Sequence, residues 1–407
     1  MEFLVYLFYI WLLCIISILT VFAHDILALW REPVLSYPVM IVESDDWGAG
    51  PLSQAPALTR LVKILNSHID RRGRHPVMTI AIILAIPDGL KIESSGEYHR
   101  IILDHRDFEP IIQALNDGVR DGVFSPQLHG LEHYWPPTLM KSDNSDVQAW
   151  LRQGQPQSTE ALPSHVQSRW INAVSLPSSP LATADIATAM QEETAVYSRV
   201  TGQPALVAVP PTFVWDDEVE RCWAKHGVEF VVTPGRRYGC RGNQGEPACT
   251  GDVLRNGDSG CGVTYLVRND YFEPEKGHDA NYALAAMTKK VKQGRPCLLE
   301  THRSNFIGED SDNAYAELDS LMQQAQGCFP DLRYMDTLEL GRAIRDGSCD
   351  LIEREWQRRI SPWVARLEQL SHFDKLARLI GLKPVLNLIV FLLSLLLQPR
   401  LAGTLLR

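Results

Sequence analysis

The 407-residue chain lacks several patterns that would place it in a common functional class. It has no long run of Lys and Arg, and its formal net charge is −10, which argues against nucleic acid as a partner. Its eight cysteines include no Cys-x-x-Cys pair with the spacing of a structural zinc site. No Gly-rich phosphate loop follows any strand-like segment, which disfavours a nucleotide-binding fold. Apolar residues still make up 45% of the chain, so most of it is expected to be globular.

The first segment, residues 1–23, lacks the positive charge that usually precedes an exported apolar helix. Glu2 is the only charged side chain before the apolar run, and the nearest Lys or Arg is Arg31, after it. The run is about long enough to cross a bilayer, and small residues near Ala23 suit a signal peptidase. We expect a transmembrane signal anchor or a signal peptide, followed by a linker at residues 24–38. The charge pattern gives almost no orientation.

The positions of the cysteines indicate the cellular compartment in which the globular part folds. Cys240, Cys249 and Cys261 fall in one Gly-rich stretch, at a spacing that suits a locally stapled loop. Such a staple favours an oxidising compartment, and the alternative is three unpaired thiols. We therefore expect a membrane-anchored protein whose globular part is extracytoplasmic, either periplasmic or at the cell surface.

From residue 39 to 346 the chain alternates strand-like and helix-like segments. Seven or eight successive βα units predict an α/β fold with a parallel sheet, closed into a distorted barrel, and an open doubly wound sheet is the alternative. The expected strands are 39–44, 77–85, 123–128, 205–209, 228–233, 263–268, 296–301 and 332–335. The expected helices, whose apolar residues recur at three- and four-residue steps, are 57–70, 109–118, 183–200, 216–225, 280–292 and 314–326.

Three regions interrupt this alternation. Residues 136–182 and 234–262 are predicted to be long excursions, which in such folds commonly build substrate clefts. The tail, residues 350–407, combines an amphipathic stretch with a nearly continuous apolar run at 385–397. That run is too short to span a membrane comfortably, so we expect the tail to associate with the membrane surface. The alternative is a helix packed on the barrel.

Polar residues follow three of the expected strands. Asp45 and Asp46 follow the first, His129 and His133 the third, and His302 the late apolar strand. Because active sites of parallel barrels form at the carboxyl ends of the strands, these side chains are expected on one rim. Carboxylate and imidazole are suitable ligands for a divalent metal such as zinc. The sequence therefore predicts a metal-dependent hydrolase.

Simpler explanations exist for each cluster. An Asp-Asp pair at a strand end can be a helix N-cap, and a lone His302 can be a hydrogen-bonded core histidine. The sequence from His129 to His133 also matches H-x-x-E-H, an inverted zinc-peptidase motif that would make Glu132 a general base. That chemistry requires a helix, which Gly130 and the nearby prolines disfavour.

The ordered motifs Ser44-Asp45-Asp46-Trp47, His129-x-x-x-His133, Pro210-Pro211 and the late His302 resemble the polysaccharide deacetylases (NodB-like, carbohydrate esterase family 4). The resemblance covers residues 39–340. It implies a distorted (β/α) barrel that removes N- or O-acetyl groups from sugar polymers or lipid-linked glycans with Zn²⁺ or another divalent ion.

Carried over by position, the resemblance implies that Asp45 is the general base and that Asp46, His129 and His133 bind the metal. His302 would be the general acid. The backbone near Thr212 would help hold the oxyanion.

The chain departs from the family pattern in three places. Gly130 stands where Ser or Thr stabilises the metal loop, and Val209 and Thr212 stand where Arg and Tyr flank the proline motif. The missing Arg would orient Asp45, and Arg303 is our substitute candidate. These departures indicate a divergent member.

Substrate contacts and two other functions remain open at this stage. Trp47, Trp135 and Trp215 follow three rim strands, and could stack on sugar rings or pack beneath the loops. A metal-independent glycoside hydrolase would need a second acid besides an Asp of the pair, from Glu132, Asp216 or Glu300. A membrane-tethered glycan-binding protein without activity is the third possibility.

Overall fold

The computed structural model describes residues 2–154 and 158–396. Parts of the predicted N-terminal segment, of the 136–182 excursion and of the C-terminal tail (residues 1, 155–157 and 397–407) lie outside the described residues.

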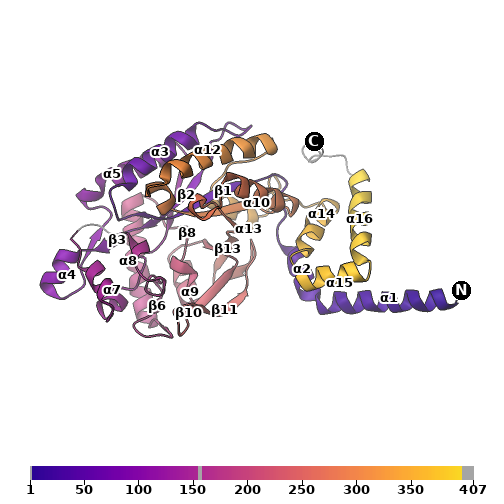
Figure 1. Cartoon of the computed structure of the whole chain (residues 1–407), viewed down its shortest axis with the longest axis horizontal. Helices are drawn as coiled ribbons and strands as arrows, with labels where there is room; N and C mark the ends of the chain where they lie inside the picture. Colours follow the sequence, from indigo (N-terminus) through magenta and orange to yellow (C-terminus); the bar gives the residue numbers. More distant parts are fainter. Residues whose placement is uncertain (1, 155–157, 397–407) are drawn as a thin grey trace.

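The centre of the molecule is a nine-stranded, mostly parallel sheet that curls into a half-barrel (Figure 1). Its order is β12-β13-β9-β8-β5-β2-β1-β15-β14, and only β12 runs antiparallel to its neighbour. The strands are β1 (Met40–Gly48), β2 (Met78–Ile83), β5 (Phe124–Leu128), β8 (Val207–Ala208), β9 (Phe230–Thr233), β12 (Ser259–Gly260), β13 (Val263–Val267), β14 (Asp270–Tyr271) and β15 (Cys297–His302). The predicted α/β class and parallel sheet are confirmed, but the sheet is a half-barrel whose end strands β12 and β14 do not pair, and not a closed barrel.

One continuous stretch of chain contributes to both ends of this curl. β13 pairs with β9, and the N–H of Arg268 still donates to the carbonyl of Thr233 at 2.9 Å. At Asn269 the partner changes, because its N–H donates to the carbonyl of Leu298 at 3.1 Å, and β14 then pairs with β15. The change of partner leaves Arg268 facing β1 and β15 at the carboxyl ends of the strands.

Helices cover the outside of the sheet (Figure 1). Each buries an apolar stripe, and several begin at an acidic N-cap, as α9 does at Asp216, which accepts from the N–H groups of Glu218 and Val219. These helices are α3 (Gln54–Asn66), α5 (Glu109–Arg120), α8 (Thr183–Thr201), α9 (Asp217–Lys225), α10 (Ala280–Lys292), α11 (Ser304–Ile307), α12 (Ser311–Cys328) and α13 (Thr337–Arg345).

Strand residues alternate between two apolar clusters. Met40 and Val42 pack in the larger cluster beneath the outer helices, whereas Val39 and Ile41 pack in a smaller cluster inside the curl. The period of two places Glu43 and Asp45 on the inner side as well. On β15, the register partners of the inward residues of β1 are Leu298, Glu300 and His302, and these also point inside the curl. The apolar interior is therefore followed, toward the carboxyl ends of the strands, by a layer of polar side chains.

The first excursion contains more regular structure than the sequence predicted: the helices α6 (Pro136–Met140) and α7 (Ser145–Leu151) and the hairpin of β6 (Ile171–Asn172) with β7 (Ser179–Pro180). Outside the predicted excursions, the segment between β2 and β5 forms a hairpin of β3 (Ala85–Pro87) with β4 (Arg100–Ile102) and the helix α4 (Gly89–Ser95). Short 3₁₀ turns occur at Arg106–Phe108, Thr159–Ala161, Ser164–Val166, Pro211–Phe213 and Pro274–Lys276.

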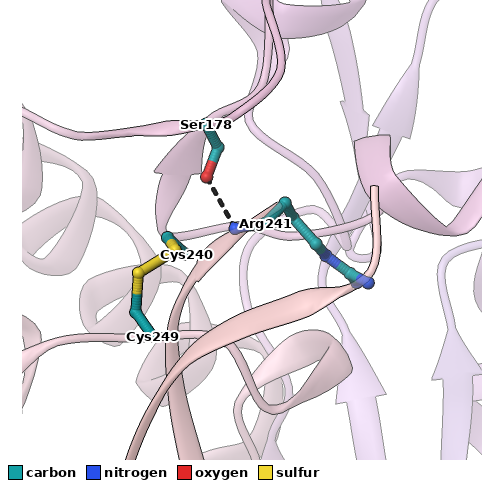
Figure 2. The surroundings of a disulfide bond; sticks show 4 residues. All are labelled: Ser178, Cys240, Arg241 and Cys249. Atoms are coloured by element: carbon teal, nitrogen blue, oxygen red, sulfur yellow. Dashed lines mark hydrogen bonds between the residues drawn. A yellow bond between two sulfur atoms is a disulfide. The ribbon is translucent and has the colours of Figure 1, made fainter. Parts of the chain in front are cut away.

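The second excursion is a hairpin of β10 (Arg236–Arg241) and β11 (Pro247–Val253). A disulfide joins Cys240 to Cys249 across it, and Cys261 is not part of this pair (Figure 2). The N–H of Arg241 donates to the hydroxyl of Ser178 at 2.8 Å, which ties the hairpin to the first excursion.

The strand predicted at residues 332–335 is wrong. This segment makes only an isolated bridge, between Arg333 and Val39. The reason is that β2 and β15 occupy both edges of β1, so the segment can reach only the start of that strand. The last position in the sheet belongs instead to β14.

The two ends of the chain form a separate helical unit beside the barrel (Figure 1). It consists of α1 (Glu2–Val21), α2 (Ala23–Arg31), α14 (Trp356–Leu367), α15 (Ser371–Leu379) and α16 (Leu382–Leu396). A small apolar cluster that includes Leu29, Phe373 and Leu382 holds these helices together. By length and composition, α1 could cross a membrane, and α15 and α16 qualify only together, across a bend of 93°.

Candidate metal centre

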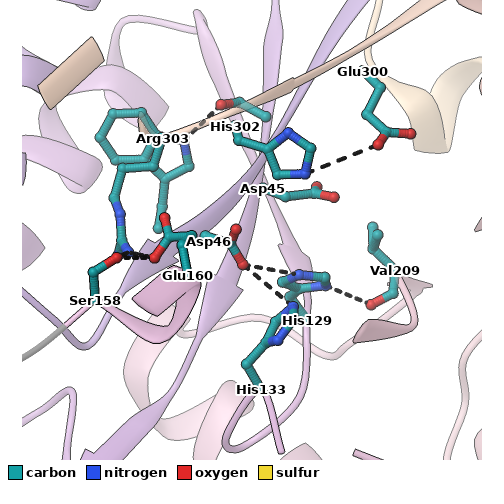
Figure 3. A network of polar contacts seen from close by, with 12 residues as sticks. Asp45, Asp46, His129, His133, Ser158, Glu160, Val209, Glu300, His302 and Arg303 are labelled. Carbon is teal, nitrogen blue, oxygen red and sulfur yellow. Dashed lines mark hydrogen bonds and ion pairs between the residues drawn. The ribbon is translucent and has the colours of Figure 1, made fainter. Parts of the chain in front are cut away.

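Three buried ligand groups converge at one end of the curled sheet (Figure 3). Oδ1 of Asp46 lies 3.4 Å from Nε2 of His129 and 3.3 Å from Nε2 of His133. One ligand atom from each residue lies within 4.8 Å of the others. The structure thus brings together the three residues that the sequence proposed as metal ligands.

A distortion of β1 allows two adjacent aspartates to serve one site. In a regular strand, neighbouring side chains point to opposite faces. The pairing of β1 with β2 shifts register between Ser44 and Trp47, and Asp46 has a φ of 72°. A bulge of this kind re-aims a side chain, and Asp tolerates the left-handed region better than most residues do. Asp46 is thereby turned toward the histidines, while Asp45 keeps the inward direction of the strand.

The histidine loop presents the nitrogens that a metal requires. Nδ1 of His129 donates to the carbonyl of Val209 at 2.7 Å, which leaves Nε2 unprotonated when the ring is neutral. Oδ1 of Asp46 and Nε2 of His129, two of the three converging atoms, are buried and have no hydrogen-bond partner in the described part of the chain. Unpartnered buried polar atoms of this kind are costly unless an ion or a water fills the space between them.

The spacing of the three atoms fits a tetrahedral ion. Zinc bonds of about 2.0–2.1 Å place tetrahedral ligands roughly 3.4 Å apart. The two distances measured from Asp46, 3.4 and 3.3 Å, agree with this value. One carboxylate and two imidazoles leave at least one position open, as a catalytic ion needs. The residues present therefore fit a divalent metal, and their geometry alone does not identify which one.

Asp45 is held by Arg268, which the sequence analysis missed. Both terminal N–H groups of Arg268 donate to the two carboxylate oxygens of Asp45, each at 2.6 Å. Nε of Arg268 donates to Glu43 at 2.7 Å, and Glu43 also accepts from the hydroxyl of Thr337. The sequence does contain one indication of this role. Arg268 ends the expected strand 263–268, two residues after the apolar Leu266, so its side chain points to the same side of the sheet.

The expectation that Arg303 orients Asp45 is wrong. The guanidinium of Arg303 donates instead to the hydroxyl of Ser158 and to the carboxylate of Glu160 (Figure 3). The physical reason is position, because Arg303 follows the end of β15 and turns away from the barrel interior. Only its backbone N–H reaches Asp45, at 3.0 Å from the carbonyl oxygen.

His302 lies beside Asp45 across the pair β1–β15, since the two residues are register partners. Nδ1 of His302 is hydrogen-bonded to the carboxylate of Glu273 at 2.5 Å, and Nε2 lies 3.9 Å from Glu300. Its side chain is 30% exposed, more than that of any metal-binding candidate. His302 is thus the one site histidine that is open to solvent and fixed by a carboxylate.

The charges of the site follow from burial and close pairing. Burial alone would raise the pKa of both aspartates. Arg268 and His129 hold the pKa of Asp45 below its usual range, and His133 and His129 do the same for the pKa of Asp46. Burial lowers the pKa of His133 to about 4, which keeps that ring neutral. Burial also lowers the pKa of His302, but Glu273 and the other carboxylates outweigh it and raise the pKa to about 9.

The proposed substrate contacts divide by burial. Trp47 and Trp215 are 0% exposed and bond through Nε1 to Ser44 and Glu220, so they pack beneath the loops and cannot stack on a sugar. Trp135 is half-buried at the edge of a 460 Å³ cavity and can meet a ligand. Thr212 has a φ of 55° and shares a hydrogen bond with Ser168.

The structure weakens two of the alternative functions, the inverted zinc peptidase and the metal-independent glycoside hydrolase. Residues 129–135 form no helix, and Glu132 bonds to Arg169 instead of facing the ligand atoms, which removes the geometry of the inverted zinc peptidase. Of the acids considered for a glycoside hydrolase, Glu132 is committed to that bond and Asp216 caps α9. Glu300 alone of the three remains near the site.

Comparisons with known proteins show a likeness of fold only. No family model matches the chain, and no curated protein sequence matches it. Among solved structures, a family 4 carbohydrate esterase from Streptomyces lividans in complex with acetate has a TM-score of 0.34 and 10% identity over 75% of this chain and 96% of that one. A mutant of a CE4 family pseudoenzyme with restored activity has a TM-score of 0.37 and 11% identity over 76% of this chain and 68% of its own.

A 4-alpha-glucanotransferase from Thermococcus litoralis scores 0.38, with 11% identity over 84% of this chain and 48% of that one. The chain is structurally similar to CE4 polysaccharide deacetylases at low sequence identity.

Proposed function

We propose that the protein is a metal-dependent hydrolase that removes N- or O-linked acetyl groups from a polysaccharide or a lipid-linked glycan. The observation that carries the proposal is the convergence of Asp46, His129 and His133, with Asp45 and His302 beside them on the same rim. The geometry supports metal-assisted hydrolysis, and the order of the sequence motifs supports an acetylated carbohydrate as substrate.

Asp46, His129 and His133 would hold the ion. A divalent ion bound there supplies polarisation of the acetyl carbonyl and a lowered pKa for water. A set of one carboxylate and two imidazoles favours zinc. The carbonyl of Val209 fixes the His129 ring so that Nε2 faces the ligand atoms, as partners of metal-binding histidines commonly do.

The proton transfers belong to Asp45 and His302. Asp45 accepts a proton from the attacking water as the new C–O bond forms, and backbone near Thr212 donates to the developing oxyanion. His302 gives its Nε2 proton to the departing amine or hydroxyl as the C–N or C–O bond breaks. Acetate and the deacetylated sugar are the products. The raised pKa of His302, about 9, keeps this acid protonated at neutral pH.

We further propose that the terminal helices hold the barrel at a membrane, with the catalytic domain on the extracytoplasmic side. α1 is apolar throughout and almost fully exposed, and the Nε1 of Trp11 donates to the carbonyl of Ile380 at 2.6 Å. α16 presents exposed apolar residues that include Leu388, Phe391 and Leu395. The disulfide between Cys240 and Cys249 supports an oxidising compartment.

The test combines metal analysis with acetate release. Full-length protein in detergent should contain about one divalent ion per chain, and should release acetate from an acetylated glycan panel of polymeric and lipid-linked substrates. Asp46→Ala and His129→Ala should lose both metal and activity. Asp312→Ala, which removes an exposed carboxylate that pairs with Arg60 and with no residue of the site, should lose neither.

Two outcomes would replace the proposal. Cleavage of glycosidic bonds that survives a strong chelator would favour a glycoside hydrolase that uses Glu300. Metal binding without acetate release across the whole panel would favour a membrane-tethered glycan-binding protein. If Asp46→Ala and His129→Ala keep the metal content of the unaltered chain, the site assignment is wrong.

A further inference from the structure

The loop between the two metal-binding histidines is held by a buried ionic cluster, which we call the Glu132 clamp: Glu132, Arg169, Arg100 and Tyr98. The side chain of Glu132 is 0% exposed, although it lies one residue before His133. One carboxylate oxygen accepts from Arg169 at 2.6 Å. The other lies 2.8 Å from Nε of Arg100, as an ion pair, and accepts from the hydroxyl of Tyr98 at 3.1 Å. Glu132 is therefore fixed by two hydrogen bonds and a further ion pair from two other segments.

Arg169 contacts the histidine loop at other points besides the carboxylate of Glu132. It donates to the carbonyl of Tyr134 at 3.3 Å, on the other side of His133. Its Nε lies 3.5 Å from Glu193 on α8, and Glu193 accepts from the backbone N–H of Leu131 at 3.1 Å. The backbone on both sides of His133 is thus connected to one guanidinium.

The loop needs such outside support because of Gly130. Gly130 has a φ of 92°, and a Cβ added there would lie 2.8 Å from the carbonyl oxygen of Glu132. A Ser or Thr at this position is therefore excluded on steric and conformational grounds. No hydroxyl side chain can brace the loop from within, and the loop is not a helix that could hold its own shape.

A buried cluster of charges is a weak source of stability, because the loss of hydration offsets much of the attraction. Its worth lies in fixing geometry. We propose that the Glu132 clamp positions the backbone of residues 131–134, so that Nε2 of His133 stays within ligand distance of Asp46. Glu132 and Arg169 are positioning residues, not metal ligands, and the inference rests on the proposed function of the site.

The test measures metal affinity and folding separately. The dissociation constant for Co²⁺ or Zn²⁺, from chelator competition, should rise about 10–100-fold in Glu132→Gln, the range typical of lost outer-shell support. The visible spectrum of bound Co²⁺ should change as well. Arg169→Met should have a similar effect, and the double variant should lose little more than either single one.

Glu220→Gln is the matched control. Glu220 is also 0% exposed and accepts from Trp215, Tyr265 and Arg237 at 2.8, 2.7 and 2.8 Å, but these groups lie outside the histidine loop. It should lower the melting temperature of the metal-free protein, as Glu132→Gln does, and leave the metal dissociation constant unchanged.

The outcomes separate this inference from the proposed function. If the unaltered chain binds no divalent ion, the proposed function fails. If it binds one, and Glu132→Gln keeps its affinity and Co²⁺ spectrum, the clamp has no positioning role. Equal losses of affinity in Glu132→Gln and Glu220→Gln would also overturn the inference. Should Glu132→Gln not fold, Arg100→Met removes one ion-pair partner that is 23% exposed and allows the same comparison.

Discussion

Arg268 donates to both carboxylate oxygens of Asp45, at 2.6 Å each, from the position directly after β13, a strand that is not a neighbour of β1 in the sheet. The bidentate fork fixes the plane of the carboxylate, which a single ammonium cannot do. Arg268, at the end of β13, thus orients the carboxylate of Asp45. The same guanidinium helps to hold the pKa of Asp45 below its usual range, so in the proposed reaction Asp45 would be a weak base.

The first prediction concerns this fork. Arg268→Lys keeps the positive charge next to Asp45 but loses the paired geometry, so we expect kcat to fall about 10²-fold or more, within the range of general-base effects. Metal content should stay near that of the unaltered chain, because Asp46 does not contact Arg268. Acetate release and metal analysis on the same preparation measure both quantities.

Arg241→Lys is the control for the loss of a buried guanidinium. Arg241 is equally buried and bonds to Ser168 and to the carbonyls of Ser164 and Gly245, away from Asp45. It should lower stability and leave kcat within a few-fold. A kcat of Arg268→Lys equal to that of the unaltered chain would show that the fork does not position the base.

The case of Arg268 shows how far sequence patterns reach. Asp45, His129 and His302 could be placed on one rim because each follows a periodic apolar strand. The contact of Arg268 with Asp45 could not be predicted, because it depends on the change of strand partner at Asn269. That change does not alter the alternation of apolar and polar residues in the sequence. The turn of Asp46 through a φ of 72° is equally local and invisible to periodicity.

Which of the three tryptophans are buried could not be predicted from the sequence either. Trp47, Trp135 and Trp215 each follow a rim strand, and only the packing of α11 and the loops separates them. Trp47 stacks on Phe306 with ring centroids 6.3 Å apart, and Trp215 lies against Trp223. The contact of Trp47 with Phe306 joins segments far apart in the sequence, so it depends on the whole fold.

The second prediction concerns the pH dependence of acetate release. His302 must be protonated to act as the acid, and Glu273 helps to raise its pKa to about 9 from an ordinary 6.5. The alkaline limb of the kcat profile should therefore move to lower pH in Glu273→Gln, toward 6.5. An exposed carboxylate on the same 3₁₀ turn, in Glu275→Gln, should leave the limb in place. An unmoved limb in Glu273→Gln would exclude His302 as the acid.

The same pair gives a stability change of definite sign. Because the pKa of His302 is higher in the folded chain, folding is stabilised by this pair below pH 6.5, and the contribution is lost as the pH rises through about 9. The difference in melting temperature between the unaltered chain and Glu273→Gln should therefore shrink over this interval.

The third prediction concerns metal removal. An ion that binds only the folded chain stabilises it by about 2.7 kcal/mol at a free concentration 100 times its dissociation constant. A chelator should therefore lower the melting temperature of the unaltered protein by several degrees. Asp46→Ala should show no such shift, since one of three ligands is gone. A chelator effect of the same size in Asp46→Ala would place the ion elsewhere.

The fourth prediction concerns the joint between the terminal helices and the barrel. Arg366 on α14 is 0% exposed, and its guanidinium donates to five backbone carbonyls at 2.7–3.2 Å. The acceptors belong to the end of α2 and the segment after it, and to the two residues directly after α10: Leu29, Glu32, Pro33, Gln293 and Gly294. One side chain therefore links both chain ends to the barrel.

Arg366→Met keeps the apolar stem and leaves these carbonyls without their donor, at about 1–3 kcal/mol for each buried group that finds no water. We expect faster hydrogen exchange and proteolysis across α14–α16 in detergent, with acetate release by the barrel retained. Arg378→Met on α15, which loses only an exposed pair with Asp374, should resemble the unaltered chain. Unchanged exchange across α14 in Arg366→Met would mean that the apolar cluster around Phe373 holds the joint by itself.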